Sequence, residues 1–350
     1  MDAARTNAWT VLIYTSASRD LEKAVADSLE EITQQGGPPV DVRVVAQMGA
    51  QGSSQRYQLH GVSQPQALEP SRPGDMSDPE ELRRFLLWGM EKYPSQQYAI
   101  VLGGHGAGFA GAVTDAQRRH MISLPELERA LGELPQKPEL VIFNTCLMAQ
   151  AEVASQLQAT GTTLVASQSE LHGLGLPLAA WLQSLPDQPD GPAAAAQLIQ
   201  AAARVPERAP AVASIDLRRW PELSQALDQL AGAILDSPES SPRLRRHISE
   251  QPELWPHPQD RPLVDQIDVA GLCARWSQDE ALPALLRQQA GQVRTLVLNI
   301  CRSSSPEAHG LSIYAPEKAL GGPVKDIYAA LSFARETRWD EAFNGLVKER

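Results

Sequence analysis

The sequence has few cysteines, which excludes one class of protein. Among 350 residues it contains only Cys146, Cys273 and Cys301. A disulfide framework needs paired cysteines, so this low and odd count is typical of a reducing compartment. We therefore expect a cytoplasmic protein with free thiols. The sequence also lacks the CxxC and HxxxH spacings that indicate a zinc site.

Long apolar runs and an excess of positive charge are missing as well. No run is long enough to cross a bilayer, and the segment from Met1 to Ala8 lacks the apolar core of a secretory signal. The chain has 31 basic and 42 acidic residues, which give a formal net charge of -11. Nucleic acids and anionic membranes attract clustered positive charge, so we expect neither as a partner.

The sequence does contain an alternation of strand-like and helical segments. Short runs of branched and aliphatic residues predict strands, and apolar residues at helical spacing predict helices between them. This alternation indicates an α/β protein with a mostly parallel central sheet and helices on both faces. The predicted strands are 10–14, 40–45, 98–103, 140–143, 164–167 and 212–215, and the predicted helices are 20–34, 78–91, 124–131 and 193–203.

From Leu217 onward helical patterns dominate, until residues 293–300 and 311–314 return to strand character. We expect these last strands to extend the same sheet. The sequence is therefore interpreted as a single unit over residues 1–350, with a core over about 1–216 and a largely helical C-terminal part over 217–350.

Two of the predicted strands end close to a reactive side chain. Residues 98–103 lead into His105, and residues 140–143 lead into Cys146. The helix between them makes a βαβ unit, so both strands end at one edge of the sheet, where α/β proteins bind ligands. A thiol with a pKa of about 8.5 needs a nearby imidazole to accept its proton. The sequence therefore predicts an enzyme with Cys146 as nucleophile and His105 as base.

Glycines surround His105 in the run Gly103–Gly108. A backbone without side chains lets a peptide carbonyl approach amide donors closely. We expect the amides of Gly106 and Cys146 to form an oxyanion hole. The segment Leu147–Val153 has a helical pattern. A helix starting there would lower the pKa of the Cys146 thiol.

A series of short blocks extends along nearly the whole chain: Trp9–Tyr14 with Asp20–Glu22, Met76–Pro79 with Leu82 and Phe85, His105–Phe109, Phe143–Ala149 with Glu152–Ala154, Val165–Gln168, and Gly310–Tyr314 with Pro316. In order and spacing these blocks resemble the clostripain family of cysteine peptidases. The resemblance implies a caspase-like fold and an endopeptidase acting on proteins or peptides. It also implies that Cys146 is the nucleophile and His105 the general base, and it leaves the oligomeric state open.

The sequence departs from the family in the residue expected to select the substrate. The family usually has an aspartate two positions before the nucleophile, associated with a basic residue at P1, the position before the scissile bond. Here that position is Asn144. A neutral amide would accommodate a polar or smaller side chain instead. Glu170 would be an alternative source of a carboxylate, and we include Asn144, Ser167 and Glu170 as candidate substrate-binding residues.

Family members are often activated by cutting themselves between the base and the nucleophile. Arg118 and Arg119 lie in a polar stretch there and are candidate cleavage sites. The alternative is a solvated turn between short strands at 111–114 and 120–122. Some relatives use calcium, but the sequence has no EF-hand-like acidic spacing. We therefore expect no cofactor, with calcium left open by the resemblance.

Other interpretations of the sequence stay open. Residues 106–111 formally match GxGxxG, which would indicate nucleotide binding if a helix began inside the motif. Cys301 and His309 form a second candidate Cys–His pair, and a zinc site built from His105, Cys146 and His172 is a further alternative. A catalytically inactive scaffold is the remaining alternative, although both catalytic residue types are present.

Overall fold

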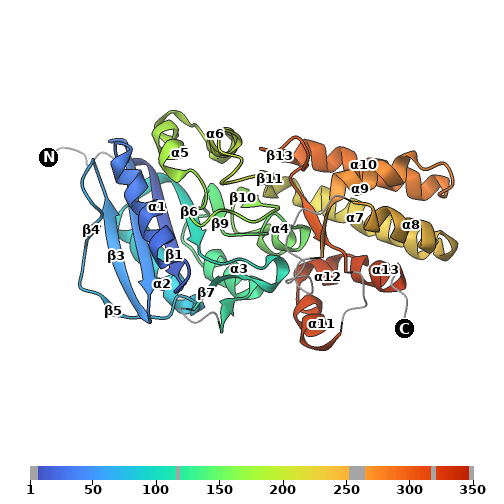
Figure 1. Ribbon diagram of the computed structural model, residues 1–350, viewed down its shortest axis with the longest axis horizontal. Helices are drawn as coiled ribbons and strands as arrows, with labels where there is room; N and C mark the ends of the chain where they lie inside the picture. Colours follow the sequence, from blue (N-terminus) through green and yellow to red (C-terminus); the bar gives the residue numbers. More distant parts are fainter. Residues whose placement is uncertain (1–6, 116–118, 252–264, 317–320, 347–350) are drawn as a thin grey trace.

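The computed structural model describes residues 7–115, 119–251, 265–316 and 321–346. At its centre is a ten-stranded sheet (Figure 1). The middle strands run parallel, in the order β10, β9, β6, β1, β2. Their bounds are Thr163–Ser167 for β10, Leu140–Asn144 for β9, Ser95–Gly103 for β6, Asn7–Ala17 for β1 and Val42–Ala50 for β2.

Antiparallel strands complete both edges of the sheet. On one side β11 (Val212–Asp216) pairs with β10, and β13 (Cys301–Ser303) pairs with β11. On the other side β3 (Ser53–Leu59) pairs with β2 and with two short strands, β4 (Gln66–Ala67) and β5 (Arg72–Pro73). The sequence pattern had not indicated β3, which follows a tight turn at Gln51 and Gly52, both with positive φ.

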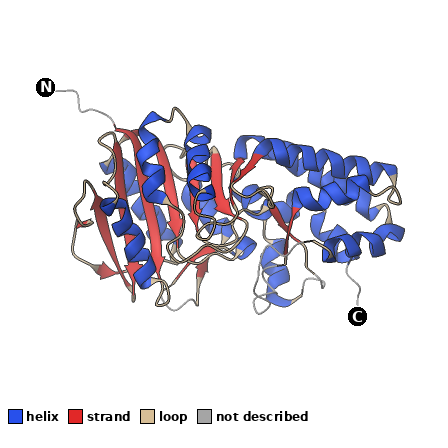
Figure 2. Ribbon diagram, turned by 45° about the horizontal axis from the view of Figure 1, so that its top comes forward, coloured by secondary structure: helices blue, strands red, loops and turns tan. Residues whose placement is uncertain are grey.

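Helices cover both faces of the sheet, as the strands between blue helices in Figure 2 show. Side chains alternate along β1, so Val11 and Ile13 pack on one face and Leu12 and Tyr14 on the other. The first face is covered by α1 (Glu22–Gln34), α5 (Leu178–Ser184) and α6 (Gly191–Ala203). The second is covered by α2 (Pro79–Lys92), α3 (Leu124–Gly132) and α4 (Ala151–Leu157).

The C-terminal part lies beyond the β11 and β13 edge of the sheet (Figure 1). Its helices are α7 (Trp220–Leu235), α8 (Ser241–Ser249), α9 (Val269–Gln278), α10 (Ala284–Ile300), α11 (Gly322–Ala329), α12 (Ser332–Glu336) and α13 (Trp339–Leu346). None of the described helices has the length and apolarity needed to span a membrane.

Two expectations for this part are wrong. Residues 293–300 form the end of helix α10, because the buried Val293, Val297 and Ile300 recur at helical spacing. Residues 311–314 do contain a strand, β14 (Ser312–Tyr314), but it pairs with β12 (Gln266–Asp268) in a separate two-stranded sheet. Within this part it is β13 that extends the main sheet.

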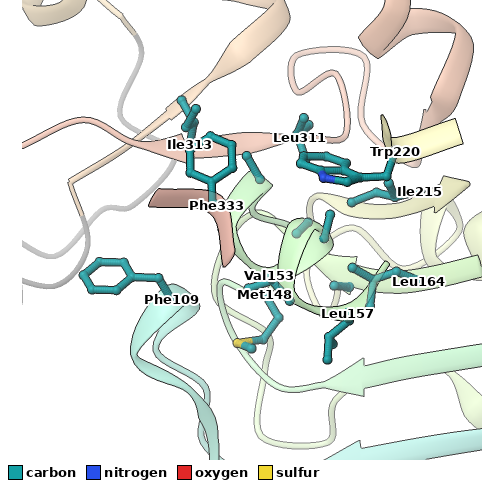
Figure 3. Packing of buried hydrophobic residues seen from close by; sticks show 14 of the residues in the cluster. Phe109, Met148, Val153, Leu157, Leu164, Ile215, Trp220, Leu311, Ile313 and Phe333 are labelled. Carbon is teal, nitrogen blue, oxygen red and sulfur yellow. The ribbon is translucent and has the colours of Figure 1, made fainter. Parts of the chain in front are cut away.

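Helix α4 joins the two parts of the molecule, and all of its residues are buried. Figure 3 shows Val153 and Leu157 of this helix close to Leu164 of the sheet, with side chains from the C-terminal part gathered above them. Those side chains include Trp220, Ile313 and Phe333. The core is therefore continuous between the parallel sheet and the C-terminal helices.

Candidate active site

The strand register brings His105 and Cys146 together. Strands β6 and β9 are parallel neighbours in which Gly103 pairs with Asn144. His105 and Cys146 each follow two residues later, at the carboxyl edge of the sheet. The loops also touch, because a Cβ atom on Gly106 would overlap the carbonyl oxygen of Cys146. Both side chains line one cavity of about 230 Å³.

The segment after Cys146 differs from the expected helix. Leu147 has a φ of 67°, and the Ala149 N–H donates to Ser167 O at 3.0 Å. Helix α4 therefore begins only at Ala151. The expectation of a helix over Leu147–Val153 with its N-terminus at the sulfur is therefore wrong for residues 147–150, where the chain turns at Leu147 and then bonds to β10 and bridges to Ser312.

The Cys146 thiol is free and half-buried. Burial raises the pKa of this thiol, and the nearby charge of Glu170 raises it further. The Leu171 N–H lowers the pKa in part by donating to Sγ at 3.4 Å. The expected lowering of the pKa is thus wrong, and the thiol keeps its proton near neutral pH.

His105 has an acidic partner that the sequence reasoning missed as a site residue. Its Nε2 lies 3.1 Å from Oδ2 of Asp20, just before helix α1. The Ser18 hydroxyl donates to Oδ1 of the same carboxylate at 2.8 Å. Burial alone would raise the pKa of Asp20, but the hydrogen bonds from Ser18 and His105 outweigh it and lower the pKa. With Nε2–H donated to Asp20, Nδ1 of the imidazole is left to exchange a proton.

The two amides expected to form an oxyanion hole lie on these adjoining loops. Gly106 forms an antiparallel bridge with Ala112. The flanking hydrogen bonds run from Val113 N–H to His105 O at 2.9 Å and from Ala107 N–H to Gly111 O at 3.0 Å. In this pattern the N–H of Gly106 points away from Ala112. The Gly106 N–H therefore takes no part in the hydrogen bonds of the hairpin.

The three candidate substrate-binding residues have different positions. Asn144 and Glu170 line the cavity. Asn144 Oδ1 accepts the Leu176 N–H at 2.6 Å, so its oxygen faces the protein. Ser167 is fully buried, and its hydroxyl donates to Ala211 O at 3.3 Å. It does not line the cavity in the part of the chain that the structure describes.

The loop of residues 171–176 forms one wall of the cavity, and the side chain of Arg208 holds this loop in place. The Arg208 guanidinium donates to the carbonyl oxygens of Leu174 and Leu176 at 2.9 Å and of Gly175 at 2.5 Å. Its charge is balanced by Glu31 of α1, at 2.9 Å. The Arg208 side chain is only 12% exposed, so these bonds are little weakened by water.

The segment between His105 and Cys146 forms a small hairpin. Strands β7 (Ala112–Thr114) and β8 (Met121–Ile122) pair antiparallel. Arg119 is exposed on the turn, and its N–H donates to Asp115 Oδ1 at 2.6 Å. Arg118, the other candidate cleavage site, lies outside the described residues.

The nucleotide-binding interpretation is wrong, because the GxGxxG match does not lead into a helix. Residues 108–110 form a single turn of 3₁₀ helix, which is followed by strand β7. A single turn without a continuing helix does not aim a row of amide donors at a pyrophosphate.

The remaining cysteines do not form a second reactive site. Burial raises the pKa of both Cys273 and Cys301 far above the usual range. His309 Nδ1 lies 2.7 Å from Asp268 Oδ1. Across the described ranges, no group of three or more His, Cys, Asp or Glu is arranged to hold a metal ion. We therefore assign ligands neither to zinc nor to calcium.

Three comparisons relate this chain to known proteins. The family model described as Clostripain family matches residues 13–278. A secreted C11 cysteine protease from Bacteroides thetaiotaomicron, in complex with an irreversible peptide inhibitor, is similar with a TM-score of 0.74 at 15% identity, over 95% of this chain and 99% of that one. An inactive zymogen C11 protease from Parabacteroides distasonis is similar with a TM-score of 0.71 at 17% identity, over 95% and 98%. No curated protein matches.

The solved structures bear on the fold. At these identities their likeness concerns the arrangement of helices and strands only. The expected caspase-like α/β fold, with a mostly parallel central sheet and helices on both faces, is confirmed.

Proposed function

The chain belongs to the clostripain family of cysteine peptidases, and on that premise we propose that Cys146 and His105 act as its catalytic dyad. One observation carries the proposal. The two side chains follow paired residues of adjacent parallel strands and line the same cavity. A thiol and an imidazole in this arrangement are the minimum that thiol-dependent hydrolysis of a peptide bond requires.

The proposed reaction begins with a protonated thiol. Because burial raises the pKa of Cys146, its proton passes to His105 as the sulfur attacks the scissile carbonyl. The amides of Gly106 and Cys146 hold the negative oxygen of the tetrahedral intermediate. His105 then donates the proton to the leaving amine. Water, deprotonated by His105, hydrolyses the thioester and releases the acid product.

The cavity beside the dyad suits a long side chain with a cationic end. Its inner wall is apolar, with Ile13, Val25 and Leu29. Glu170 is the one carboxylate among the described residues that line it. Because the Asn144 oxygen is bonded to Leu176, Glu170 is the group that can pair with an ammonium or guanidinium. We therefore propose an Arg or Lys preference at P1, with Glu170 in the place of the missing aspartate.

A peptide library that varies P1 tests both assignments. We expect the wild type to cleave after Arg or Lys and Cys146→Ala to lose at least about a thousandfold in kcat. Glu170→Gln should lower kcat/KM for Arg relative to Gln at P1 by about tenfold, since a charge-assisted hydrogen bond is lost. Glu239→Gln, an exposed glutamate of the C-terminal part, is the matched control. Turnover that survives in Cys146→Ala would exclude the nucleophile, and an Arg preference retained in Glu170→Gln would exclude that carboxylate.

We also propose that the chain cuts itself after Arg118 or Arg119. Arg119 is exposed in the hairpin turn between β7 and β8, as a cleavable bond must be. Intact mass spectrometry of the purified wild type should give two fragments that join at one of these residues, and Cys146→Ala should give the full-length mass. A full-length wild type that is already active would argue against this step.

The proposed substrate is a protein or peptide. The acidic balance of the chain, with a formal net charge of -11, disfavours nucleic acid and anionic membrane as partners. The three cysteines are free in the structure, which is compatible with the cytoplasmic location that we propose.

A further inference from the structure

A second cavity, of about 530 Å³, opens at the same edge of the sheet. It lies on the other face, beside the start of helix α2, whereas the cavity described above lies beside α1. Its wall includes Ser16 of β1, Arg72 of β5, Asp75 and Asp78 before α2, Glu81 in the first turn of α2, and Asp115 after β7. None of these residues belongs to the proposed dyad or its P1 pocket.

The end of β1 and the loop that carries His105 lie between the two cavities. Thr15 lines the first cavity and Ser16 lines the second, as expected for consecutive residues of a strand. A Cβ atom on Gly104 would lie 3.0 Å from the Ser16 carbonyl oxygen, and Gly104 directly precedes His105. The second cavity therefore adjoins the His105 side of the proposed dyad.

One residue of the cavity wall, Ser16, carries a buried hydroxyl without a partner in the described part of the chain. Ser16 is only 1% exposed, and its hydroxyl makes no hydrogen bond to any described residue. An unpaired buried hydroxyl costs free energy, and a ligand or water that bonds to it would remove that cost. This observation is independent of the charges around it.

The charges of the wall favour a cation. The wall of this cavity contains four carboxylates and two guanidiniums, those of Arg72 and Arg84. Both arginines pair with Glu81. Among the described residues, Asp75 accepts hydrogen bonds from the N–H and hydroxyl of Ser77, and Asp115 accepts them from backbone N–H groups. Neither carboxylate forms an ion pair with an arginine of the described residues.

The geometry of an extended peptide connects the two cavities. Successive side chains of an extended chain point to opposite sides. A peptide whose P1 side chain enters the first cavity thus directs its next side chain, at P1′, toward the other face. The leaving amine also lies on the His105 side, because His105 donates its proton to it. We propose that the second cavity is the P1′ subsite and that it binds a Lys or Arg side chain, an inference that rests on the proposed function.

Peptides with a fixed P1 residue and Lys, Arg, Ala or Glu at P1′ test this proposal. We expect the wild type to cleave the Lys and Arg peptides with a kcat/KM about tenfold above that of the Glu peptide. Asp75→Asn keeps an oxygen for both Ser77 donors but removes the charge, so it should bring the Lys to Glu ratio close to one. Asp115→Asn is the second variant, and Glu239→Gln should leave the ratio at its wild-type value.

The outcomes separate this proposal from the function on which it rests. An amide substrate with a dye in place of the P1′ residue reports the dyad alone. If the wild type cleaves it but shows equal rates across the P1′ series, the subsite is refuted and the dyad stands. An equal loss on all peptides in Asp75→Asn, with the Lys to Glu ratio retained, would also refute the subsite. If neither the dye substrate nor any peptide separates the wild type from Cys146→Ala, both proposals fail.

Discussion

At the scale of single residues, different neighbours control the protonation of the thiol and the orientation of the imidazole. Burial raises the pKa of Cys146 more than the Leu171 N–H lowers it, which leaves the thiol protonated at rest. His105 is oriented by Asp20, whose carboxylate is in turn bonded to Ser18. Before the attack on substrate, the pair therefore consists of a neutral thiol and an imidazole whose Nε2 is hydrogen-bonded to Asp20. Orientation of the base is then a separate contribution to the rate.

This division predicts the effect of Asp20→Asn. Without the carboxylate, the imidazolium formed during attack loses its nearby negative charge, and the ring is held less firmly. We expect kcat to fall about tenfold to a hundredfold, less than in a buried triad because Asp20 is partly exposed, with KM nearly unchanged. Ser18→Ala, which keeps the bond between Asp20 and His105, should lose much less. A kcat for Asp20→Asn equal to that of the wild type would contradict a positioning role.

The sequence made the two reactive residues predictable but not their acidic neighbour. Cys146 and His105 each end an apolar run, and the helix between the runs specifies a parallel pair of strands. The role of Asp20 depends on β1 lying beside β6, which local patterns do not encode. Asp20 lies three residues after the end of β1, and that position at the same edge was the available signal.

At the scale of elements, regular segments were predictable where one periodicity dominated. The helix expected over 78–91 is α2, which starts after the N-cap Asp78 with Pro79 in its first turn. Residues 293–300 were ambiguous, because a short apolar run fits a strand or a buried helix. Their helical spacing is clear only with Leu286 and Ala290 of the preceding turns.

Tertiary hydrogen bonds overrode local propensity after Cys146. Residues 147–149 have helix-forming side chains, yet Ala149 donates to Ser167 and accepts from the Ser312 N–H at 2.9 Å. These bonds come from strands distant in sequence, which no local pattern reveals. The same holds for the 171–176 loop, whose shape depends on Arg208. The walls of the cavity were therefore less predictable than the ends of the strands that carry the dyad.

At the scale of the whole molecule, helix α4 connects the loop that carries Cys146 to the C-terminal part. Its Ser155 hydroxyl donates to Glu336 at 2.9 Å, and Gln156 accepts the Ser332 N–H at 2.9 Å. Glu152 is fully buried between these parts. Its Oε1 accepts the Tyr314 N–H at 3.0 Å and the Tyr328 hydroxyl at 2.9 Å.

Glu152 makes the contact between the two parts sensitive to pH. Burial raises the pKa of its carboxyl to about 7, although hydrogen bonds from backbone N–H groups and Tyr328 oppose the shift. Among the described residues Oε2 has no hydrogen-bond partner, so the carboxyl can carry its proton on this oxygen. Because the folded state holds this proton more tightly than the unfolded chain, the contribution of Glu152 to stability is full below its ordinary pKa. It is lost as the pH rises through about 7.

We therefore expect Glu152→Gln to stabilise the protein at pH 8 relative to the wild type, by about 2–3 kcal/mol in the free energy of unfolding. An amide keeps the oxygen that Tyr314 and Tyr328 need but cannot ionise, so the gain should shrink toward zero at pH 5. Urea unfolding at both pH values measures it. The pKa of Asp340 is also raised, to about 6, so the wild-type profile contains both groups and the difference between the variants isolates Glu152. A gain that is the same at pH 5 and pH 8 would mean that Glu152 does not titrate in this range.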